Sequence, residues 1–303
     1  MLGRVTVIGG GHGLAAVLAA LRHEPCELTA VVTVADDGGS SGELRRHGGG
    51  PAVGDLRRAL VALAADGTPL ARALERPVTV NRSGRHPLGN LVIRSLADVF
   101  GDLGHAVDRL GLELGIRAQV VPATVDNVSL MAEAGGGVIF GESAIGTSQA
   151  AIRRLRFSPE RPRVSDAALA SIATSDYVLL GPGSLFTSVL AVCALPDVVS
   201  ALLATAARKV WICNLQRQPG ETAGMSASGH LAALRRHGIR VDAVLYDPEA
   251  EVSFAPTHLA RRGVEAIPRP LQDDEPGIHD PVLLRTALRG ILARPRQTAS
   301  AAS

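Results

Sequence analysis

The sequence predicts an α/β fold with a Rossmann-like, doubly wound and mainly parallel sheet. Short apolar, β-branched segments alternate with helix-like segments in both halves of the chain. Three glycine-rich loops each follow directly after a strand-like segment, where ligands bind in open parallel sheets. The composition of the 303 residues, 46% hydrophobic and 3% aromatic, provides a large core built from Val, Leu, Ile and Ala.

The first half of the chain begins with a regular alternation of strand and helix. Residues 35–42 are polar and so rich in glycine that we expect a loop there and not a helix. A second loop at 48–54 precedes a helix whose N-cap we expect to be Asp55. The expected elements are, in order, a strand at 4–8, a helix at 14–22, a strand at 28–34 and a helix at 55–65.

The middle of the chain is less regular, and the second half resumes the alternation. Two short apolar segments joined across glycines 135–137 predict an antiparallel hairpin inserted into the parallel fold. The other expected elements are strands at 119–123, 177–180, 210–214 and 241–246, helices at 90–100, 184–194 and 224–237, and hairpin strands at 128–131 and 138–140. With no linker between the halves, we predict one domain over 1–293 and a disordered tail over 294–303.

Composition excludes several classes of function. A formal net charge of +2 and few aromatic residues disfavour a nucleic-acid-binding protein. Three widely spaced cysteines, Cys26, Cys193 and Cys213, favour the reducing cytoplasm over a disulfide framework. The uncharged stretch 177–196 contains a Gly-Pro-Gly turn, so we expect a strand, a turn and a helix and no membrane span. We expect no signal peptide, and the histidines show no metal-ligand spacing.

The first glycine-rich loop has the sequence GGGHGL at 9–14. Read from Gly11, it satisfies the G-x-G-x-x-A pattern between a strand and a helix. Glycines let a phosphate approach the backbone, and the helix N-terminus offers free N–H groups. The alternative is a tight turn without a ligand. For His12 the sequence leaves open a steric role, a hydrogen-bonding role or a role as a catalytic base.

The second loop places Asp36 and Asp37 at the end of the second strand. An acid at this position holds ribose hydroxyls in dinucleotide-binding folds. Two adjacent acids can also hold Mg²⁺, or divide the roles of hydroxyl binding and turn capping. A solvated Asp-Asp-Gly turn is the structural alternative.

The third loop, 180–188, combines Gly-Pro-Gly with a hydroxyl-rich helix start at Ser184. This pattern predicts a second anion cradle, with a purely structural turn as the alternative. The loop at 214–222 contains amides, an acid and a hydroxyl group, which can form hydrogen bonds with sugar hydroxyls or with the edge of a base. The alternative is a loop that only caps the next helix. Of the arginine pairs, Arg45 and Arg57 lie closest to these loops and could meet phosphate.

Six strings in this order resemble one family: GGGHGL, VTVADDGGSSGELR, GDLRRALVALA, HPLGNL, GPGSLFTS and NLQRQPGETAGMSASGH. They are similar to the YvcK type of the CofD/YvcK superfamily, over about residues 5–246. The resemblance implies a Rossmann-like fold, a cytoplasmic location and binding of UDP-sugars such as UDP-N-acetylglucosamine. It further implies the role of a gluconeogenesis factor in carbon metabolism, cell-wall synthesis and cell shape. No established reaction belongs to this type.

The resemblance has limits and a rival. Loop 51–55 is one residue longer than usual, His12 replaces a Thr, Gly229 replaces an Asp, and Gln216-Arg217 stands where Met-Thr is frequent. The rival is the CofD branch, a Mg²⁺-dependent 2-phospho-L-lactate transferase with a guanosine diphosphate-linked donor in the coenzyme F420 pathway. In that case Asp36 and Asp37 would hold Mg²⁺. An NAD-dependent oxidoreductase is supported by the first loop alone.

The resemblance and the loops together define the expected site. We expect a binding protein with no catalytic residue and no required cofactor, with protein partners in metabolism or wall synthesis and a homodimer left open. The residues expected to bind the phosphate and the UDP-sugar are Gly9, Gly10, Gly11, His12, Gly13, Leu14, Asp36, Asp37, Gly38, Gly39, Ser40, Ser41, Asp55, Asn90, Gly181, Pro182, Gly183, Ser184, Thr187, Asn214, Gln218, Gly220, Glu221 and Thr222.

Overall fold

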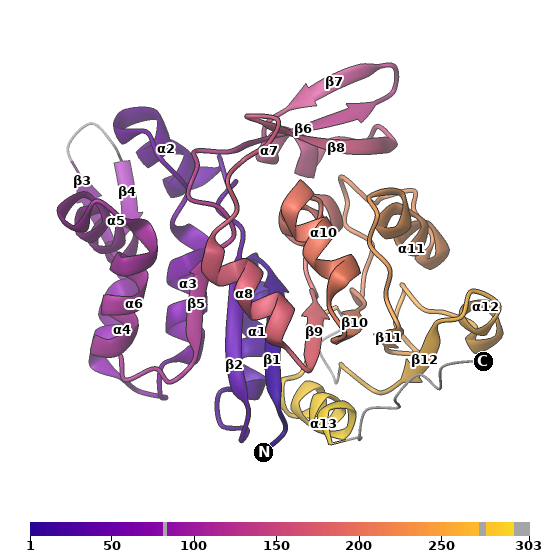
Figure 1. The fold of residues 1–303 in the computed structure, drawn as a ribbon. Helices are drawn as coiled ribbons and strands as arrows, with labels where there is room; N and C mark the ends of the chain where they lie inside the picture. The colour runs from indigo at the N-terminus through magenta and orange to yellow at the C-terminus, as the bar shows by residue number, and fades with distance from the viewer. Residues whose placement is uncertain (81–83, 273–276, 294–303) are drawn as a thin grey trace.

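A seven-stranded parallel sheet forms the centre of the computed structural model, which describes residues 1–80, 84–272 and 277–293 (Figure 1). The spatial order of its strands is β12-β11-β10-β9-β1-β2-β5. The next strands of this sheet along the chain, β2 and β5, lie on one side of β1, and the later strands β9 to β12 lie on the other side. The strands are β1 (Arg4–Gly9), β2 (Glu27–Val32), β5 (Gln119–Pro122), β9 (Tyr177–Leu180), β10 (Arg208–Ile212), β11 (Ala243–Tyr246) and β12 (Glu265–Pro268). The predicted Rossmann-like, doubly wound fold is therefore confirmed.

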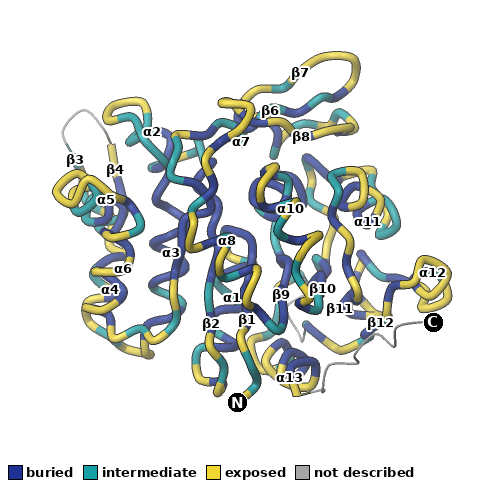
Figure 2. The backbone as a smooth tube through the Cα atoms, viewed as in Figure 1, coloured by how far each residue is buried: buried dark blue, intermediate teal, exposed yellow. Residues whose placement is uncertain are grey.

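The strand order reverses between β1 and β9, which are hydrogen-bonded neighbours. At such a switch point, the loops after the two strands diverge and leave a crevice at the carboxyl edge of the sheet. Both strands are buried almost completely, as expected for parallel strands covered on both faces (Figure 2). The topology therefore places the first and third glycine-rich loops side by side.

Helices cover both faces of the sheet. In Figure 1, α8 (Asp166–Thr174) lies in front of the central strands, and α1 (Gly11–Leu21) and α3 (Gly54–Leu63) lie behind them. The remaining helices are α2 (Gly39–Gly48), α4 (Pro69–Glu75), α5 (Leu88–Phe100), α6 (Leu103–Glu113), α7 (Glu142–Thr147), the π-helical turn η1 (Leu185–Val189), α9 (Leu190–Cys193), α10 (Pro196–Ala204), α11 (Ala227–Arg236), α12 (Pro256–Ala260) and α13 (Pro281–Leu292).

Two small antiparallel sheets interrupt the parallel fold. One is the hairpin of β3 (Pro77–Val80) and β4 (Gly84–Pro87). The other contains β6 (Ser129–Ala134), β7 (Gly137–Phe140) and β8 (Ile152–Ser158) in the order β7-β6-β8. The predicted hairpin is confirmed, and β8 is an additional third strand. We call residues 129–158, which include α7, the arm; Figure 1 shows it above the carboxyl edge of the central sheet.

Three local predictions were wrong. Helix α2 starts at Gly39, inside the expected loop, because contacts to neighbouring elements outweigh the low helix propensity of its glycines. Asp55 is not an N-cap: α3 begins at Gly54, and Asp55 lies in its first turn. The helix expected at 184–194 begins as the π-helical turn η1 and continues as α9. The single-domain boundary stays a prediction, and the expected tail 294–303 lies outside the described residues.

The uncharged stretch 177–196 forms β9, a turn, η1 and α9, so the order of strand, turn and helix is as predicted, apart from the π-helical start of the helix. Among the described helices, no single one has the length and apolar character needed to cross a membrane.

Candidate functional site

A cavity of about 390 Å³ lies at the switch point, beside the loops that follow β1, β2 and β9. Residues from α3, the arm and the loop after β10 complete it. It is lined by Gly10, Gly11, His12, Gly13, Thr33, Asp36, Asp55, Arg58, Glu142, Gly183, Ser184, Thr187, Ser188 and Gln218. This volume is typical of a small-molecule or cofactor site.

The first loop needs its glycines for three different reasons. A Cβ on Gly10 would lie 2.5 Å from Asp55 Oδ2, and one on Gly13 would lie 2.3 Å from the carbonyl oxygen of Pro182. Gly11 has a φ of +64° and faces open space, where the nearest atom to an added Cβ would be Ser188 Oγ at 4.0 Å. Because α1 begins here with no side-chain cap at Gly10, the loop presents backbone N–H groups to the cavity.

The two adjacent acids of the second loop have separate roles. Asp36 lines the cavity and accepts a hydrogen bond from the backbone N–H of Gly38 at 2.9 Å. Asp37 instead accepts the backbone N–H groups of Glu142 and Ser143, each at 2.9 Å, and so caps α7. Asp37 therefore holds the start of α7, and Asp36 is the acid of the pair that lines the cavity.

Asp55 and Arg58 form an ion pair on α3, with 2.5 Å between Asp55 Oδ1 and Arg58 Nη1. Burial raises the pKa of Asp55, an effect opposed by Arg58 and reinforced by Asp36. The Asp55 carboxyl also lies against the glycine-rich loop, where Asp55 Oδ2 leaves no room for a Cβ on Gly10. Asp55 therefore packs against the turn that begins α1.

Glu142, the first residue of α7, brings a third carboxyl to the cavity. Burial, followed by repulsion from Asp36 and Asp37, raises the pKa of Glu142 to about 7. The described residues nonetheless contain no group of three or more His, Cys, Asp or Glu side chains placed to hold a metal ion.

The third loop differs from the expected empty anion cradle. The buried carboxylate of Glu221 accepts the backbone N–H groups of Phe186 and Thr187 at 3.1 Å each, so these amides are occupied. Burial raises the pKa of Glu221 to about 7. Asn214 fixes the preceding turn through two 2.9 Å hydrogen bonds with the backbone of Gly183. This loop therefore presents the hydroxyl groups of Ser184, Thr187 and Ser188 to the cavity.

Gln218 has an acceptor atom that lacks a donor. Its Nε2 donates to Ser184 Oγ, whereas its Oε1 is buried and has no hydrogen-bond partner. A buried oxygen without a donor costs free energy unless a ligand or water supplies one. Because Gln218 lines the cavity, we expect a ligand N–H or O–H group at this point.

Several expected residues support the site without lining it. Asp37 and Glu221 cap helices, Thr222 Oγ1 accepts the backbone N–H of Gln218, and Gly220 packs against α7. The other expected residues outside the lining are Gly9, Leu14, Gly38, Gly39, Ser40, Ser41, Asn90, Gly181, Pro182 and Asn214.

Ser40 and Asn90 belong to a separate buried cluster. Ser40 Oγ lies 2.8 Å from His86 Nδ1 and accepts from Asn90 Nδ2 at 2.9 Å. These bonds join α2 to β4 and α5. The two expected arginines also have structural partners: Arg45 donates to the carbonyl oxygens of Ala35, Asp36 and Val128, and Arg57 pairs with Glu75.

Four lining residues, Thr33, Arg58, Glu142 and Ser188, were missed from the sequence. Arg58 was detectable, because it lies one helical turn after Asp55. Ser188 follows Thr187 in the third loop, and Thr33 lies near the end of the second expected strand. Glu142 carried no local signal, since only the tertiary placement of the arm brings it to the cavity.

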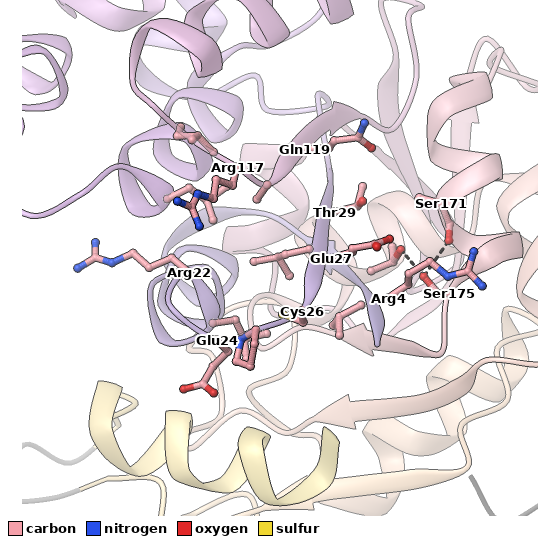
Figure 3. Close-up of a pocket in the computed structure, with 18 of the residues that line it drawn as sticks. Arg4, Arg22, Glu24, Cys26, Glu27, Thr29, Arg117, Gln119, Ser171 and Ser175 are labelled. Carbon is pink, nitrogen blue, oxygen red and sulfur yellow. Dashed lines mark hydrogen bonds between the residues drawn. The ribbon is translucent and has the colours of Figure 1, made fainter. Parts of the chain in front are cut away.

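A larger cavity of about 1160 Å³ lies at the opposite edge of the sheet, near the amino ends of β1, β2 and β5 (Figure 3). Several of its charged residues already have partners: Arg22 pairs with Asp66, and Glu24 with Arg285. It contains no glycine-rich loop that follows a strand. The smaller cavity at the carboxyl edge is therefore the better candidate site.

Comparisons with known proteins show the family of the chain. The family model described as 2-phospho-L-lactate transferase CofD matches residues 5–273. A Bacillus subtilis protein named "Gluconeogenesis factor" is 39% identical over 237 residues, which cover 77% of this chain and 74% of the relative. A Mycobacterium tuberculosis relative is 38% identical over 311 residues, covering 96% of this chain and 90% of the relative.

The fold also matches a solved structure. The crystal structure of a UPF0052 family member from Bacillus halodurans superimposes with a TM-score of 0.88 at 34% sequence identity. The match covers 94% of this chain and 98% of that one.

Proposed function

The chain belongs to the CofD/YvcK family, and we propose that it acts as a UDP-sugar-binding protein with UDP-N-acetylglucosamine as the ligand type. In this proposal, ligand binding regulates carbon metabolism, cell-wall synthesis and cell shape. The name of the Bacillus subtilis relative supports a role in gluconeogenesis. The comparisons support the family, and the UDP-sugar is the ligand that the resemblance to the YvcK type implies.

The observation that carries the proposal is the combination of an open glycine-rich loop with an unpaired acceptor in the same cavity. The N-terminus of α1 offers backbone N–H groups around His12 and Gly13 to a diphosphate. Gln218 Oε1 requires a donor, which a sugar hydroxyl, an acetamido N–H or a uracil N–H can supply. Asp36 is available to accept ribose or sugar hydroxyls.

The proposal places the diphosphate on the first loop alone. The amides of Phe186 and Thr187 are occupied by Glu221, so the third loop contributes hydroxyl groups instead. We further propose a cytoplasmic location, which the three free cysteines support. Protein partners in metabolism or wall synthesis, and a homodimer, are parts of the same proposal.

A thermal-shift screen tests the ligand class. The screen compares UDP-N-acetylglucosamine, UDP-glucose, UDP, GDP and NAD, each with and without Mg²⁺. We expect the UDP-sugars to stabilise the protein with little effect of Mg²⁺, by about 2.7 kcal/mol at a concentration of 100 Kd.

A Gly11→Val variant tests the place of binding. Its side chain would fill the approach of the phosphate, so we expect binding to be lost from a folded protein. Gly49→Val is a matched control, because Gly49 has a φ of +66°, faces open space and lies outside the cavity. It carries the same backbone strain and should retain binding.

Two outcomes would contradict the proposal. UDP-sugar binding by Gly11→Val at the parent's affinity would show that the glycine-rich loop is not the cradle. Mg²⁺-dependent consumption of a guanosine diphosphate-linked donor would instead favour the transferase.

A further inference from the structure

Strand β7 forms an open edge of the arm. The order β7-β6-β8 leaves one side of β7 without a neighbouring strand in the part of the chain that the structure describes. Figure 1 shows this strand at the top of the molecule, away from the central sheet. Val138 and Phe140, which share one face of β7, have 65% and 61% of their surface exposed. The edge therefore presents two large apolar side chains to solvent.

The pairing with β6 determines which backbone groups of β7 point outward. The N–H of Gly141 donates to the carbonyl oxygen of Leu130 at 2.8 Å, and the register continues without a break through β7. Successive residues of an antiparallel strand direct their N–H and C=O groups to opposite sides. Those of Val138 and Phe140 therefore point away from β6. Among the described residues, no hydrogen bond outside the sheet is made by the backbone of these two residues.

The usual protection of an edge strand is missing from β7. Exposed edges normally carry charged side chains, a proline or a bulge, which prevent pairing with other strands. The four residues of β7, Gly-Val-Ile-Phe, include neither a charge nor a proline. The irregularity in the pairing of this sheet lies between β6 and β8, on the other side of β6. The sequence of β7 is therefore that of a strand that can accept a further strand.

These features favour a strand as the occupant of the edge over a lipid surface. Inserted in lipid, the outward N–H and C=O groups of β7 would have no partner, whereas a further strand satisfies them. A peptide strand that is selected by its sequence needs pockets for its alternate side chains beside the edge. Neither of the two cavities described above includes a residue of β7. The occupant should therefore be a strand that matches Val138 and Phe140 directly.

A second copy of β7 provides this match by symmetry. Antiparallel pairing about a two-fold axis at Ile139 places Val138 opposite Phe140 of the second copy, and Phe140 opposite Val138 of the second copy. Both residues of each pair have outward backbone groups, so each pair can exchange two hydrogen bonds. Cross-strand pairs of an aromatic and a β-branched side chain are also favourable.

The charges of the arm are compatible with this arrangement. Glu133 lies opposite Val138 on β6, and its carboxylate is paired with Arg156. Arg154 lies opposite Glu133 on β8, the strand farthest from the open edge. Two copies joined through β7 would form a sheet in the order β8-β6-β7-β7-β6-β8. Apolar residues would meet at its centre, and the arginines would lie on its two outer strands.

We propose that β7 is the interface of a homodimer, in which the arms of two copies form one continuous antiparallel sheet. The inference specifies the homodimer named in the proposed function and rests on that part of it, independently of the ligand. The shared edge is only four residues long, so the buried area is small for a specific interface. We therefore expect a monomer–dimer equilibrium in the micromolar range.

Sedimentation velocity at protein concentrations of about 1–200 µM measures this equilibrium. We expect the parent to move from the monomer towards twice the monomer mass as the concentration rises. Val138→Lys and Phe140→Glu each place a charge opposite an apolar side chain of the second copy. We expect each variant alone to dimerise at least about tenfold more weakly than the parent. Both side chains are exposed, so circular dichroism and urea denaturation should show a folded protein of parental stability.

An equimolar mixture of the two variants is the decisive sample. In a mixed dimer, the introduced lysine lies opposite the introduced glutamate, and the other pair keeps the native Phe140 and Val138. We expect the mixture to dimerise at least about tenfold more tightly than either variant alone. This recovery requires both a second copy as the occupant and the register proposed here.

Val99→Lys is the matched control, because Val99 is 78% exposed on α5, outside the arm. It should dimerise as the parent does. A dimer that both β7 variants retain would overturn the interface and leave the homodimer standing. A parent that stays monomeric at every concentration would overturn both.

Two further results would assign the edge to a different occupant. A mixture that stays monomeric would overturn the pairing of β7 with a second copy. A monomeric parent that sediments with phosphatidylglycerol vesicles, and loses this binding in Phe140→Glu, would assign the edge to a lipid surface. The thermal-shift screen tests the ligand separately, so absence of UDP-sugar binding would overturn that part of the proposed function without affecting the interface.

Discussion

Asp36 and Asp37 are adjacent in the chain but act on different parts of the molecule. Asp36 faces the cavity, whereas Asp37 uses both carboxylate oxygens to accept the N–H groups that begin α7. Adjacent residues in an extended loop point to opposite sides, so one acid can bind ligand while the other organises the backbone. The sequence left divided roles open for the two acids, and the binding of a ligand hydroxyl by Asp36 stays a prediction.

Substitution of each acid by asparagine should separate the two roles. In Asp37→Asn, one backbone N–H of α7 would face the amide group, so we expect a loss of about 1–2 kcal/mol in the free energy of unfolding. Asp36→Asn retains an acceptor oxygen, so we expect nearly unchanged stability and a loss of at most about 1.5–3 kcal/mol in ligand binding. Urea denaturation and calorimetric titration measure the two quantities. Equal stability losses in both variants would contradict the division of roles.

At the scale of elements, the arm joins the second ligand loop to the loop at 214–222. Asp37 caps the start of α7, and the end of α7 packs against Gly220. A hydrogen bond from Gln149 Nε2 to the carbonyl oxygen of Pro219 lies beside this contact. Glu142 is carried between these two attachments, so its position in the cavity depends on both.

The contact between α7 and the loop at 214–222 requires a glycine at position 220. A Cβ there would lie 1.8 Å from the carbonyl oxygen of Gly146, so Gly220→Ala must push the two segments apart. We expect it to cost about 1–3 kcal/mol of stability and to weaken ligand binding, because Gln218 and Glu142 would both move.

Gly146→Ala is the matched control for this contact. It changes the other glycine of the pair, where a Cβ would meet nothing within 4 Å, and alanine favours helix α7. We expect unchanged or slightly higher stability and normal binding. Urea denaturation of both variants measures the difference, and equal stability of Gly220→Ala and the parent would show that the contact is not tight.

At the scale of the whole molecule, local patterns predicted the central sheet better than the insertions. The strands β1, β9 and β11 are short apolar runs bounded by polar or glycine-rich segments, and buried parallel strands have this pattern. Strand β8 was missed because its buried residues Ile152, Leu155 and Phe157 are separated by exposed charged residues in an irregular spacing. The bulge in its pairing at Glu133/Ala134 interrupts the two-residue period.

The parts of the candidate site that are consecutive in the sequence were predictable, whereas the parts that come from distant segments were not. The glycine-rich loop was predictable because strand, glycine pattern and helix are consecutive in the chain. The roles of Asp37 and Glu221 as caps were not, since each carboxylate serves an element distant in sequence. Helix α2 likewise required the packing of Ser40 against His86 and Asn90, which residues 35–42 alone do not reveal.

In the ligand-free protein, buried glutamates and buried histidines change the free energy of unfolding in opposite directions as the pH rises. Glu142 and Glu221 have a pKa raised to about 7 from 4.5, so the folded protein binds more protons than the unfolded chain between these values. Their contribution to stability therefore falls as the pH rises through this window. Burial lowers the pKa of His230, His237 and His279, whose contribution changes in the opposite direction. A single variant is needed to isolate the contribution of one carboxyl.

Glu142→Gln removes one carboxyl and leaves the histidines unchanged. Near pH 4.5 both proteins have a neutral side chain at position 142, so their stabilities should be similar. At pH 7.5 the parent is destabilised by an ionised Glu142 among Asp36, Asp37 and Asp55, and the variant is not. We expect the stability of the variant relative to the parent to increase by about 2 kcal/mol across this range. Urea denaturation at closely spaced pH values measures this difference, with Glu133→Gln as the control that should show no such trend. A constant difference across the range would mean that Glu142 ionises as easily in the folded protein as in the unfolded chain.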